Sequence, residues 1–222
     1  MNSSSYAPIS HYLDYTQLKP GATLSEVQEL CEEGIRHEVA AICVSPMYVA
    51  AVAHMLADTS TACCTVVGFP HGLHLTETKM AEAQALIQAG AQELDMVNNL
   101  SLLREGNWAE LEQEISLFAN ICRSEGGISK LIIESGLLTF EEIGAICDIC
   151  ITANVDFVKT STGFAAVGAE VEKVTWMRDY LPDHVRIKAS GGIRTYEDAK
   201  AFVAAGASRI GASTLIVEPK NT

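Results

Sequence analysis

The chain has 222 residues, of which 48% are hydrophobic and 19% are charged, and its formal net charge is -13. These proportions are typical of a soluble globular protein with a sizeable core. The acidic balance argues against a general nucleic-acid binder and against docking on anionic membranes. No apolar run approaches the roughly 18 residues of a membrane span, and the first residues have neither the basic nor the apolar region of a signal peptide. An anionic ligand would therefore need a local site.

Seven cysteines are spread along the chain, and most of them lie inside apolar runs. This odd number and placement indicate reduced thiols rather than a disulfide scaffold, and they favour a cytoplasmic protein. The cysteines are Cys31, Cys43, Cys63, Cys64, Cys122, Cys147 and Cys150. Cys147 and Cys150 form a single CxxC on one face of an expected helix, which predicts core packing rather than a zinc site.

Short apolar segments alternate with longer helical patterns from one end of the chain to the other. This alternation is typical of βαβ units and predicts a parallel sheet. We predict eight strands, at residues 12–15, 39–44, 64–68, 93–97, 130–134, 156–159, 186–188 and 209–211. Most of them are continuously apolar, as expected for strands that are covered on both faces.

The segments between the strands carry helix start and stop signals. Capping boxes predict helix starts after Thr23 and Thr139, and a close variant does so after Thr195. Glycines that precede the next strand predict helix ends at Gly34, Gly90 and Gly206. No linker interrupts the chain, so we expect one domain over residues 1–222. Eight units in this length favour a (β/α)8 TIM barrel, although a doubly wound open sheet would show the same alternation.

Two lysines stand at the ends of predicted strands, each directly before a turn that contains glycine. They are Lys159, before the turn that ends at Gly163, and Lys188, before Gly191 and Gly192. Burial disfavours an ammonium group, and two ammonium groups that face one pocket disfavour each other. A neutral lysine amine attacks carbonyl groups and forms a Schiff base. The alternative is that such a lysine extends its charged end to water.

Polar residues interrupt the predicted strands at several places, and in a barrel such positions converge near the carboxyl ends of the strands. Asp95 stands between apolar neighbours in its strand, and a carboxylate beside an amine and a water molecule can relay protons. A structural ion-pair cluster would use the same residues. The interrupting residues are Asp14, Cys43, Asp95, Glu134, Lys159 and Lys188.

Glycine-containing turns follow the last three predicted strands. Late strands of a (β/α)8 barrel commonly bind phosphate through N–H groups of such loops, and Arg194 would add a charged contact. Any one of these glycines alone is explained by turn chemistry, but three such turns in succession favour an anion site. The residues expected to form it are Gly163, Gly191, Gly192, Arg194, Gly211 and Ser213.

The sequence resembles the deoxyribose-phosphate aldolase family in segments that cover essentially the whole chain in the family's order. The most specific segments are VKTSTGF, IKASGGIRT and ELDMVNN, and the others are LDYTQLKP, AAICVSP, VVGFPHG, LIIESGLLT and RIGAST. The resemblance implies a TIM barrel that reversibly cleaves 2-deoxy-D-ribose 5-phosphate to D-glyceraldehyde 3-phosphate and acetaldehyde.

The resemblance also implies roles for individual residues. Lys159 would form the Schiff base, Lys188 would favour its neutral amine and join the proton relay, and Asp95 would move protons through water. Neither a metal nor an organic cofactor would be needed, and the assembly would be a homodimer, although no interface patch is recognisable. Supporting residues would be Asp14, Thr16, Cys43 and Thr160.

One position departs from the pattern of some relatives, which carry a lysine directly after the STG turn where this chain has Phe164. Phosphate binding would then depend more on backbone groups, Ser213 and Arg194.

Two alternatives to a deoxyribose-phosphate aldolase stay open. The chain could be another Schiff-base aldolase that acts on a different phosphorylated aldehyde, or a non-catalytic sugar-phosphate-binding barrel. A metal-dependent aldolase is disfavoured because the histidines are scattered; His71 and His74 are interpreted as polar loop lining.

Overall fold

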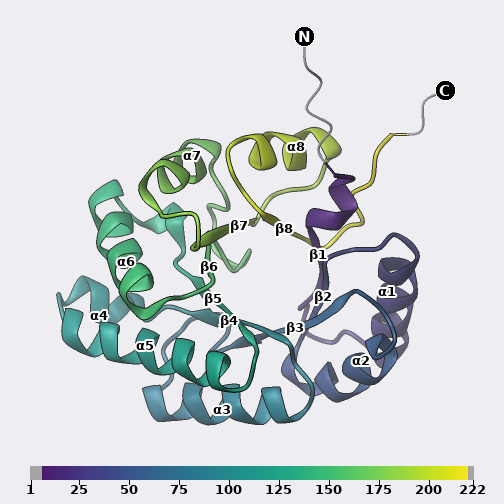
Figure 1. Ribbon diagram of the computed structural model, residues 1–222, viewed down its shortest axis with the longest axis horizontal. Coiled ribbons are helices and arrows are strands. Elements are labelled where there is room, and N and C mark those ends of the chain that lie inside the picture. Colours follow the sequence, from purple (N-terminus) through teal and green to yellow (C-terminus); the bar gives the residue numbers. More distant parts are fainter. Residues whose placement is uncertain (1–6, 220–222) are drawn as a thin grey trace.

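Eight parallel strands form a closed barrel in the computed structural model, which describes residues 7–219 (Figure 1). Each strand pairs with the next one along the chain, and β1 pairs with β8, so the open-sheet alternative is wrong and the barrel prediction is confirmed. The strands are β1 Leu13–Gln17, β2 Ala41–Val44, β3 Ala62–Val67, β4 Glu93–Val97, β5 Ile128–Ile132, β6 Phe157–Lys159, β7 Arg186–Ser190 and β8 Arg209–Ala212. A single domain over residues 1–222 remains a prediction.

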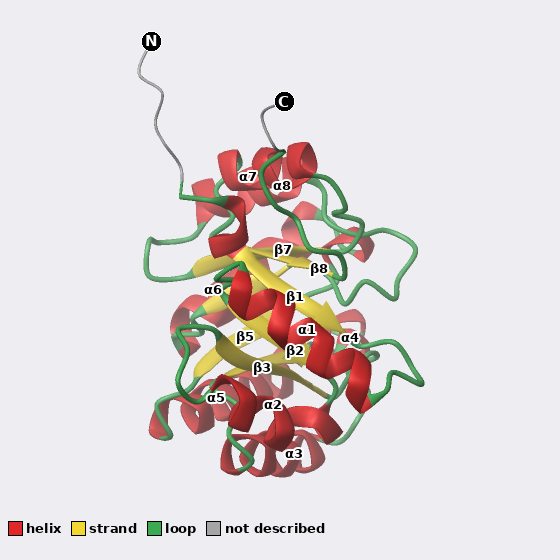
Figure 2. Cartoon of the chain, turned by 90° about the vertical axis from the view of Figure 1, so that its right-hand side faces the viewer, coloured by secondary structure: helices red, strands yellow, loops and turns green. Residues whose placement is uncertain are grey.

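Helices surround the barrel and cover its outer face (Figures 1 and 2). The α-helices are α1 Leu24–Arg36, α2 Val49–Leu56, α3 Thr76–Gln88, α4 Leu100–Arg104, α5 Trp108–Ser124, α6 Phe140–Ala153, α7 Val171–Tyr180 and α8 Tyr196–Ala204. Short 3-10 helices precede β1 at Ile9–Tyr12 and follow β2 and β5 at Pro46–Tyr48 and Ser135–Leu137. No helix among residues 7–219 is long and apolar enough to cross a membrane.

The three predicted helix starts are confirmed in atomic detail. Thr23, Thr139 and Thr195 are the N-caps of α1, α6 and α8, and each accepts a hydrogen bond from the backbone N–H three residues later. The acidic side chain at that later position accepts the N–H of the cap in return, which completes a capping box.

Two of the three predicted helix ends are confirmed. Gly90 and Gly206 follow α3 and α8 with φ of 105° and 104°, a backbone region that glycine adopts without steric cost. The prediction at Gly34 is wrong, because α1 continues to Arg36. A Cβ atom on Gly34 would overlap Cδ1 of Ile42 and lie 3.0 Å from Cγ2 of Val39. This glycine therefore permits close packing of α1 on β2 rather than ending the helix.

Successive residues of each strand face either the helices outside the barrel or the barrel interior. The sequence-based prediction of continuously apolar strands did not separate these two environments. Outward-facing strand residues join the helices in one large apolar core. Inward-facing residues of β2 and β3 form a separate apolar cluster of Ala41, Cys43, Cys64 and Val66. The remaining inner surface carries charged side chains, described below. Strand β5 begins and ends two residues earlier than predicted, and Glu134 lies beyond it with φ 53° and ψ 54°.

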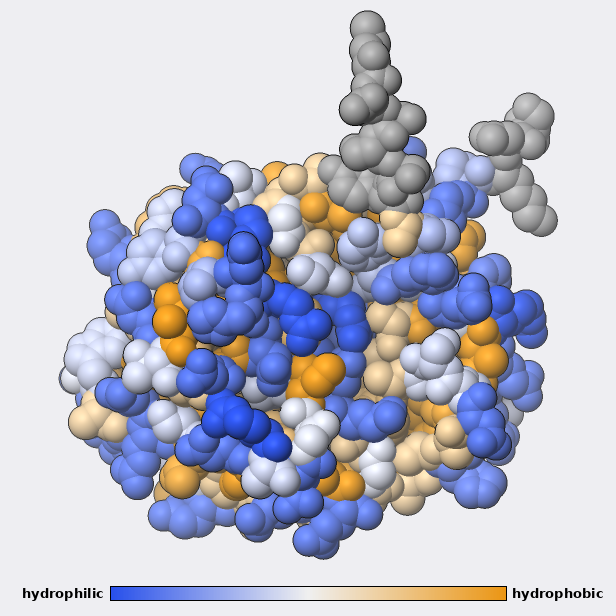
Figure 3. All heavy atoms as spheres, viewed as in Figure 1, coloured by the Kyte–Doolittle hydropathy of each residue, from blue (hydrophilic) through white to orange (hydrophobic). Residues whose placement is uncertain are grey.

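The face of the molecule seen in Figure 3 is mostly hydrophilic, with hydrophobic groups in small separate areas. This is the surface expected of a chain with a net charge of -13. Among the residues drawn in colour, no single apolar area dominates that face, so the homodimer remains a prediction without a recognisable interface there.

Two buried helical glycines allow the packing role of Gly34 to be tested. Gly34→Ala should lower the free energy of unfolding by about 1 kcal/mol, because overpacking outweighs the gain in helix propensity. Gly144→Ala is the matched control, since a Cβ atom there would lie 3.4 Å from Trp176, and it should be neutral or stabilising by up to about 1 kcal/mol. Urea unfolding measures both, and a Gly34→Ala variant as stable as the control would contradict the packing argument.

Candidate active site

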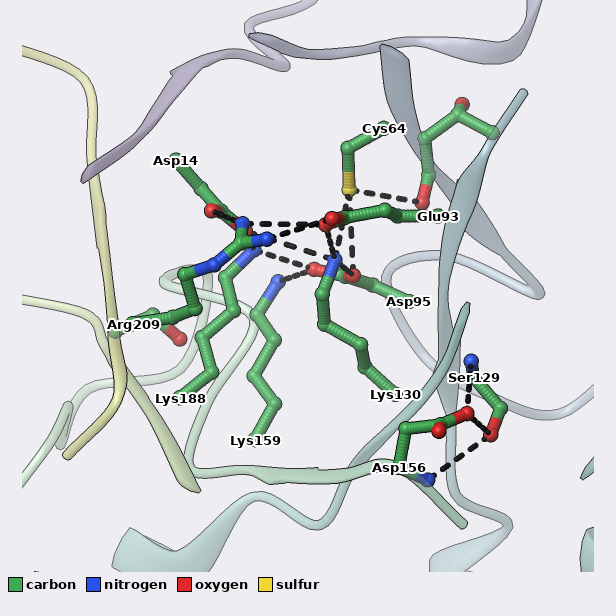
Figure 4. A network of polar contacts seen from close by, with 12 residues as sticks. Asp14, Cys64, Glu93, Asp95, Ser129, Lys130, Asp156, Lys159, Lys188 and Arg209 are labelled. Atoms are coloured by element: carbon green, nitrogen blue, oxygen red, sulfur yellow. Dashed lines mark hydrogen bonds and ion pairs between the residues drawn. The ribbon is translucent and has the colours of Figure 1, made fainter. Parts of the chain in front are cut away.

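Seven charged side chains of the described residues point into the barrel and contact one another (Figure 4). We call this group the interior charge cluster. Its members are Asp14, Glu93, Asp95, Lys130, Lys159, Lys188 and Arg209. They come from β1, β4, β5, β6, β7 and β8, so the closure of the sheet is what brings them together.

Asp95 lies at the centre of the interior charge cluster and is fully buried. Its Oδ2 accepts hydrogen bonds from Nζ of Lys159 and Nζ of Lys188, each at 2.7 Å, and its Oδ1 accepts one from Lys130 at 2.8 Å. Burial raises the pKa of Asp95, but the charges of Lys130, Lys159 and Lys188 outweigh it and hold the pKa well below its usual range. The residue is therefore an ionised carboxylate that accepts hydrogen bonds from three lysines.

The other two carboxylates are compensated in the same way. Asp14 contacts Lys188 and Arg209, and burial fails to raise its pKa because these two cations lower it below the ordinary value. Glu93 accepts from Arg209 Nη2 at 2.6 Å and lies 2.6 Å from Nζ of Lys130. Each carboxylate in the cluster thus contacts at least two cations.

The three lysines differ in how many carboxylates they contact. Lys130 lies within 3.6 Å of Asp14, Glu93 and Asp95, and Lys188 contacts Asp14 and Asp95. Burial lowers the pKa of both lysines, but the neighbouring carboxylates outweigh it, so both pKa values lie above the ordinary lysine value and both groups are ammonium ions.

Lys159 is the least compensated lysine of the cluster. Its Nζ contacts Asp95 alone among the carboxylates, and it shares the Oδ2 atom with Lys188. Its side chain also reaches a cavity of about 260 Å³ at the carboxyl ends of the strands. Of the seven charged side chains, only Lys159 lines this cavity, so it is the amine of the interior charge cluster that a molecule in the cavity would meet.

The predicted phosphate residues all line the same cavity. They are Gly163, Gly191, Gly192, Arg194, Gly211 and Ser213. Gly163, Gly191 and Gly192 have φ between 84° and 90°, which sets the turns that curve round the cavity. Lys19, which sequence analysis did not single out, lines the cavity as well and is a third basic side chain there, after Lys159 and Arg194.

The residues expected to support the site occupy different places. Thr16 lines the cavity, and its Oγ1 donates to the carbonyl of Asp14 at 2.8 Å. Thr160 is buried away from it and joins β6 to β7, because its Oγ1 donates to the carbonyl of Ser190 at 2.9 Å and accepts from its N–H at 3.0 Å. Cys43 does not line the cavity and packs in the apolar cluster of β2 and β3.

Three members of the interior charge cluster were missed by sequence analysis. Glu93 and Arg209 are the first residues of β4 and β8, and Lys130 is the middle residue of β5; a charge at such a position is easily interpreted as solvent-facing. Glu93 was detectable, because it stands two residues before Asp95 and therefore points to the same face of the strand.

The remaining candidate motifs lie outside the cavity. His71 and His74 are exposed in the loop after β3, and Cys147 and Cys150 are buried in α6, in agreement with their interpretation as loop lining and core packing. Sγ of Cys43, Sγ of Cys64 and an oxygen of Asp95 lie within 4.8 Å of one another. That carboxylate, however, is already bound by three ammonium groups.

Comparison with known proteins shows the family of the chain. The model of the DeoC/LacD family of aldolases matches residues 10–216. The chain belongs to this family. It is 46% identical over 206 residues to a deoxyribose-phosphate aldolase of Caldanaerobacter subterraneus subsp. tengcongensis, covering 92% of this chain and 89% of the relative. It is 42% identical over 208 residues to deoxyribose-phosphate aldolase 1 of Vibrio vulnificus, covering 94% of each.

Solved structures share the fold of the chain. A deoxyribose phosphate aldolase of Aeropyrum pernix, described as having a unique tetrameric structure, gives a TM-score of 0.86 at 33% identity and covers 92% of this chain and 86% of its own. Orotidine 5'-phosphate decarboxylase of Pyrococcus horikoshii gives a TM-score of 0.63 at 16% identity, with 89% and 88% covered, and shares the fold alone.

Asp95 and Lys159 differ in how many oppositely charged groups they contact, and this difference predicts different effects of their substitution on stability. Asp95→Asn leaves three buried lysines without their common partner and should lower the free energy of unfolding by about 3 kcal/mol or more. Lys159→Met removes the least compensated cation and should leave stability unchanged or raised. Urea unfolding at pH 7.5 measures both, with the exposed Lys200→Met as a control; equal losses for Asp95→Asn and Lys159→Met would contradict the unequal compensation.

Proposed function

We propose that the chain is a class I deoxyribose-phosphate aldolase that reversibly cleaves 2-deoxy-D-ribose 5-phosphate to D-glyceraldehyde 3-phosphate and acetaldehyde. One observation carries the proposal: Lys159, the least compensated amine of the interior charge cluster, is the one that faces the cavity. Membership of the DeoC/LacD aldolases and the names of the relatives support the same activity.

In this proposal Lys159 is the nucleophile. Its amine adds to the C1 carbonyl of the sugar, and loss of water gives an imine. The protonated imine accepts the electron pair of the C2–C3 bond, so that C3 leaves as the aldehyde of glyceraldehyde 3-phosphate when its hydroxyl loses a proton. The enamine that remains on Lys159 is protonated at C2, and water then releases acetaldehyde.

Asp95 and Lys188 are proposed to serve proton transfer. Asp95 Oδ2 lies 2.7 Å from Nζ of both Lys159 and Lys188, which is a suitable distance for passing a proton between the two amines. Because Asp95 does not line the cavity, its exchange with substrate oxygen and carbon would pass through water or Lys159. Before substrate binds, Lys188 is an ammonium ion, and its charge disfavours a second charge on the neighbouring lysine.

Borohydride trapping tests the role of Lys159. Acetaldehyde and borohydride should add a reduced two-carbon adduct to the peptide that contains Lys159, and Lys159→Met should abolish both the adduct and activity. The matched control is Lys19→Met, which removes the other lysine that lines the cavity and should still be trapped.

Two outcomes would contradict the assignment. An adduct on Lys188 would identify a different nucleophile, and the absence of any adduct would favour a non-catalytic sugar-phosphate-binding barrel. Activity should also survive exhaustive chelation; a loss that zinc restores would favour the metal-dependent class.

The phosphate is proposed to bind to the turns after β6, β7 and β8. Turn N–H groups around Gly191 and Gly192, the hydroxyl of Ser213 and the charge of Arg194 offer donors on one side of the cavity. Phe164 is 51% exposed at the same mouth and makes an edge contact with Phe69, with ring centroids 5.2 Å apart. An apolar ring therefore stands where some relatives have a cation.

Substitutions at the mouth should change phosphate preference in opposite directions. Ser213→Asp places a carboxylate beside the dianion and should lower kcat/KM for deoxyribose 5-phosphate while leaving free deoxyribose nearly unaffected. Phe164→Lys adds a cation and should raise the ratio of the two kcat/KM values. A ratio that stays at the parent value in both variants would place the phosphate elsewhere and favour an aldolase for a different phosphorylated aldehyde.

We also propose a cytoplasmic location and a homodimeric state. The seven cysteines are all buried free thiols, which supports a reducing compartment such as the cytoplasm. A homodimer is proposed on the family resemblance alone, and sedimentation equilibrium distinguishes it from a monomer or a tetramer.

A further inference from the structure

Glu93 and Arg209 form a buried ion pair that the proposed reaction does not use. Arg209 donates from Nη2 to Glu93 Oε1 at 2.6 Å and from Nη1 to Glu93 Oε2 at 3.2 Å, which makes the ion pair bidentate. Glu93 also contacts Lys130, and Arg209 also contacts Asp14. Neither Glu93 nor Arg209 lines the cavity, so neither touches a bound substrate. Their contacts nevertheless connect them to every part of the interior charge cluster.

The numbers of positive and negative groups in the interior charge cluster are unequal. When fully ionised, its three carboxylates face three ammonium groups and one guanidinium, which leaves one positive charge in excess. Arg209 cannot give up a proton at any working pH, and Lys130 and Lys188 each contact two or more carboxylates. Lys159 contacts one carboxylate oxygen, shared with Lys188, so it is the least compensated cation of the cluster.

We infer that Glu93 and Arg209 are positioning residues that set the charge balance of the barrel interior, and that this balance keeps Lys159 available as a neutral amine. The inference rests on the proposed role of Lys159 as the nucleophile. Arg209 supplies a permanent positive charge, so that the cluster would be electrically neutral with one of its lysines deprotonated. Glu93 supplies the third negative charge, which limits the excess of positive charge to one. In this view the nucleophile is selected by the whole cluster rather than by Lys188 alone.

Each of the other seven strands of the barrel contributes a charged or titratable group that faces Lys159 or its neighbours. These groups are Asp14 on β1, Cys43 on β2, Cys64 on β3, Glu93 and Asp95 on β4, Lys130 on β5, Arg186 and Lys188 on β7, and Arg209 on β8. Arg186 lies over the ring of Phe157, 4.0 Å from its centre.

Cys43 is a group in this set whose pKa lies below the ordinary value of a thiol. A hydrogen bond with Cys64 lowers its pKa against the effect of burial, and Lys188 adds to the lowering. Burial and the contact with Cys43 hold the pKa of Cys64 well above the ordinary value, so Cys64 stays a thiol. Cys43→Ala is therefore the control that separates titration of the thiol from titration of the lysine.

The test measures the rate of borohydride trapping with acetaldehyde as a function of pH, because acetaldehyde carries no ionisable phosphate. In the parent protein the trapping rate should rise with pH as Lys159 loses its proton, and the midpoint of this rise is the quantity compared. Glu93→Gln raises the excess to two positive charges and should move this midpoint down by about one pH unit. Arg209→Met removes the excess and should move it up by about as much. Below the parent midpoint, each shift is close to a tenfold change in trapping rate.

Two further variants separate charge balance from structural damage. The double variant Glu93→Gln with Arg209→Met again has one positive charge in excess and should return the midpoint close to the parent value. Arg209→Lys keeps the charge and should also remain close to the parent value. A residue that merely holds the fold would not give opposite shifts that cancel when combined. If a single variant fails to fold, the double variant and Arg209→Lys still test the inference, because both must keep the parent midpoint.

The outcomes distinguish this inference from the proposed function. An adduct on Lys159 with midpoints that move in the same direction, or that do not move in Glu93→Gln and Arg209→Met, overturns the charge-balance inference and leaves the nucleophile in place. An adduct on another residue of the parent protein overturns the proposed function first. A parent midpoint that disappears in Cys43→Ala assigns the titration to the thiol and overturns the inference.

Discussion

The barrel interior depends on one constraint, which is that the fully buried Asp95 must be compensated by three lysines. A carboxylate removed from water costs far more than a folded protein can absorb unless cations and hydrogen bonds replace the water. The register of the sheet supplies them, because Asp95 lies opposite Lys130 on β5, and Lys159 lies opposite Lys188 on the neighbouring pair β6 and β7. The proposed chemistry and the stability of the interior therefore rest on the same contacts.

The fold could be predicted from the sequence because it depends on repetition. Eight alternating units, capping boxes and strand-ending turns are local signals that agree with one another along the chain. The errors occur where tertiary packing decides. Gly34 is a residue type that often ends a helix, but here it lies inside α1 and allows the helix to pack closely against Ile42. The end of β5 was misplaced because Ile133 continues an apolar run, whereas the backbone leaves the sheet before Glu134.

The part of the candidate site that could be predicted consists of residues that interrupt or end an apolar strand. Lys159, Lys188 and Asp95 interrupt or end apolar strands, and the glycine turns follow directly. Glu93, Lys130 and Arg209 were missed because their significance depends on which face of the strand they occupy, and treating strands as continuously apolar conceals that alternation. The position of Cys43 away from the cavity surface depends on side-chain packing that no local pattern records.

The division of the barrel interior into a charged side and an apolar side has a consequence for ionic strength. The interior charge cluster faces the apolar cluster of β2 and β3 and is almost wholly removed from solvent. Mobile ions screen exposed charges over about 8 Å at physiological salt but reach buried groups poorly. For the proposed reaction, salt would therefore affect substrate binding and chemistry differently. Binding of a dianion at the exposed mouth, where Arg194 and Ser213 lie, would weaken as salt rises, while the proposed bond making and breaking at Lys159 would continue almost unchanged.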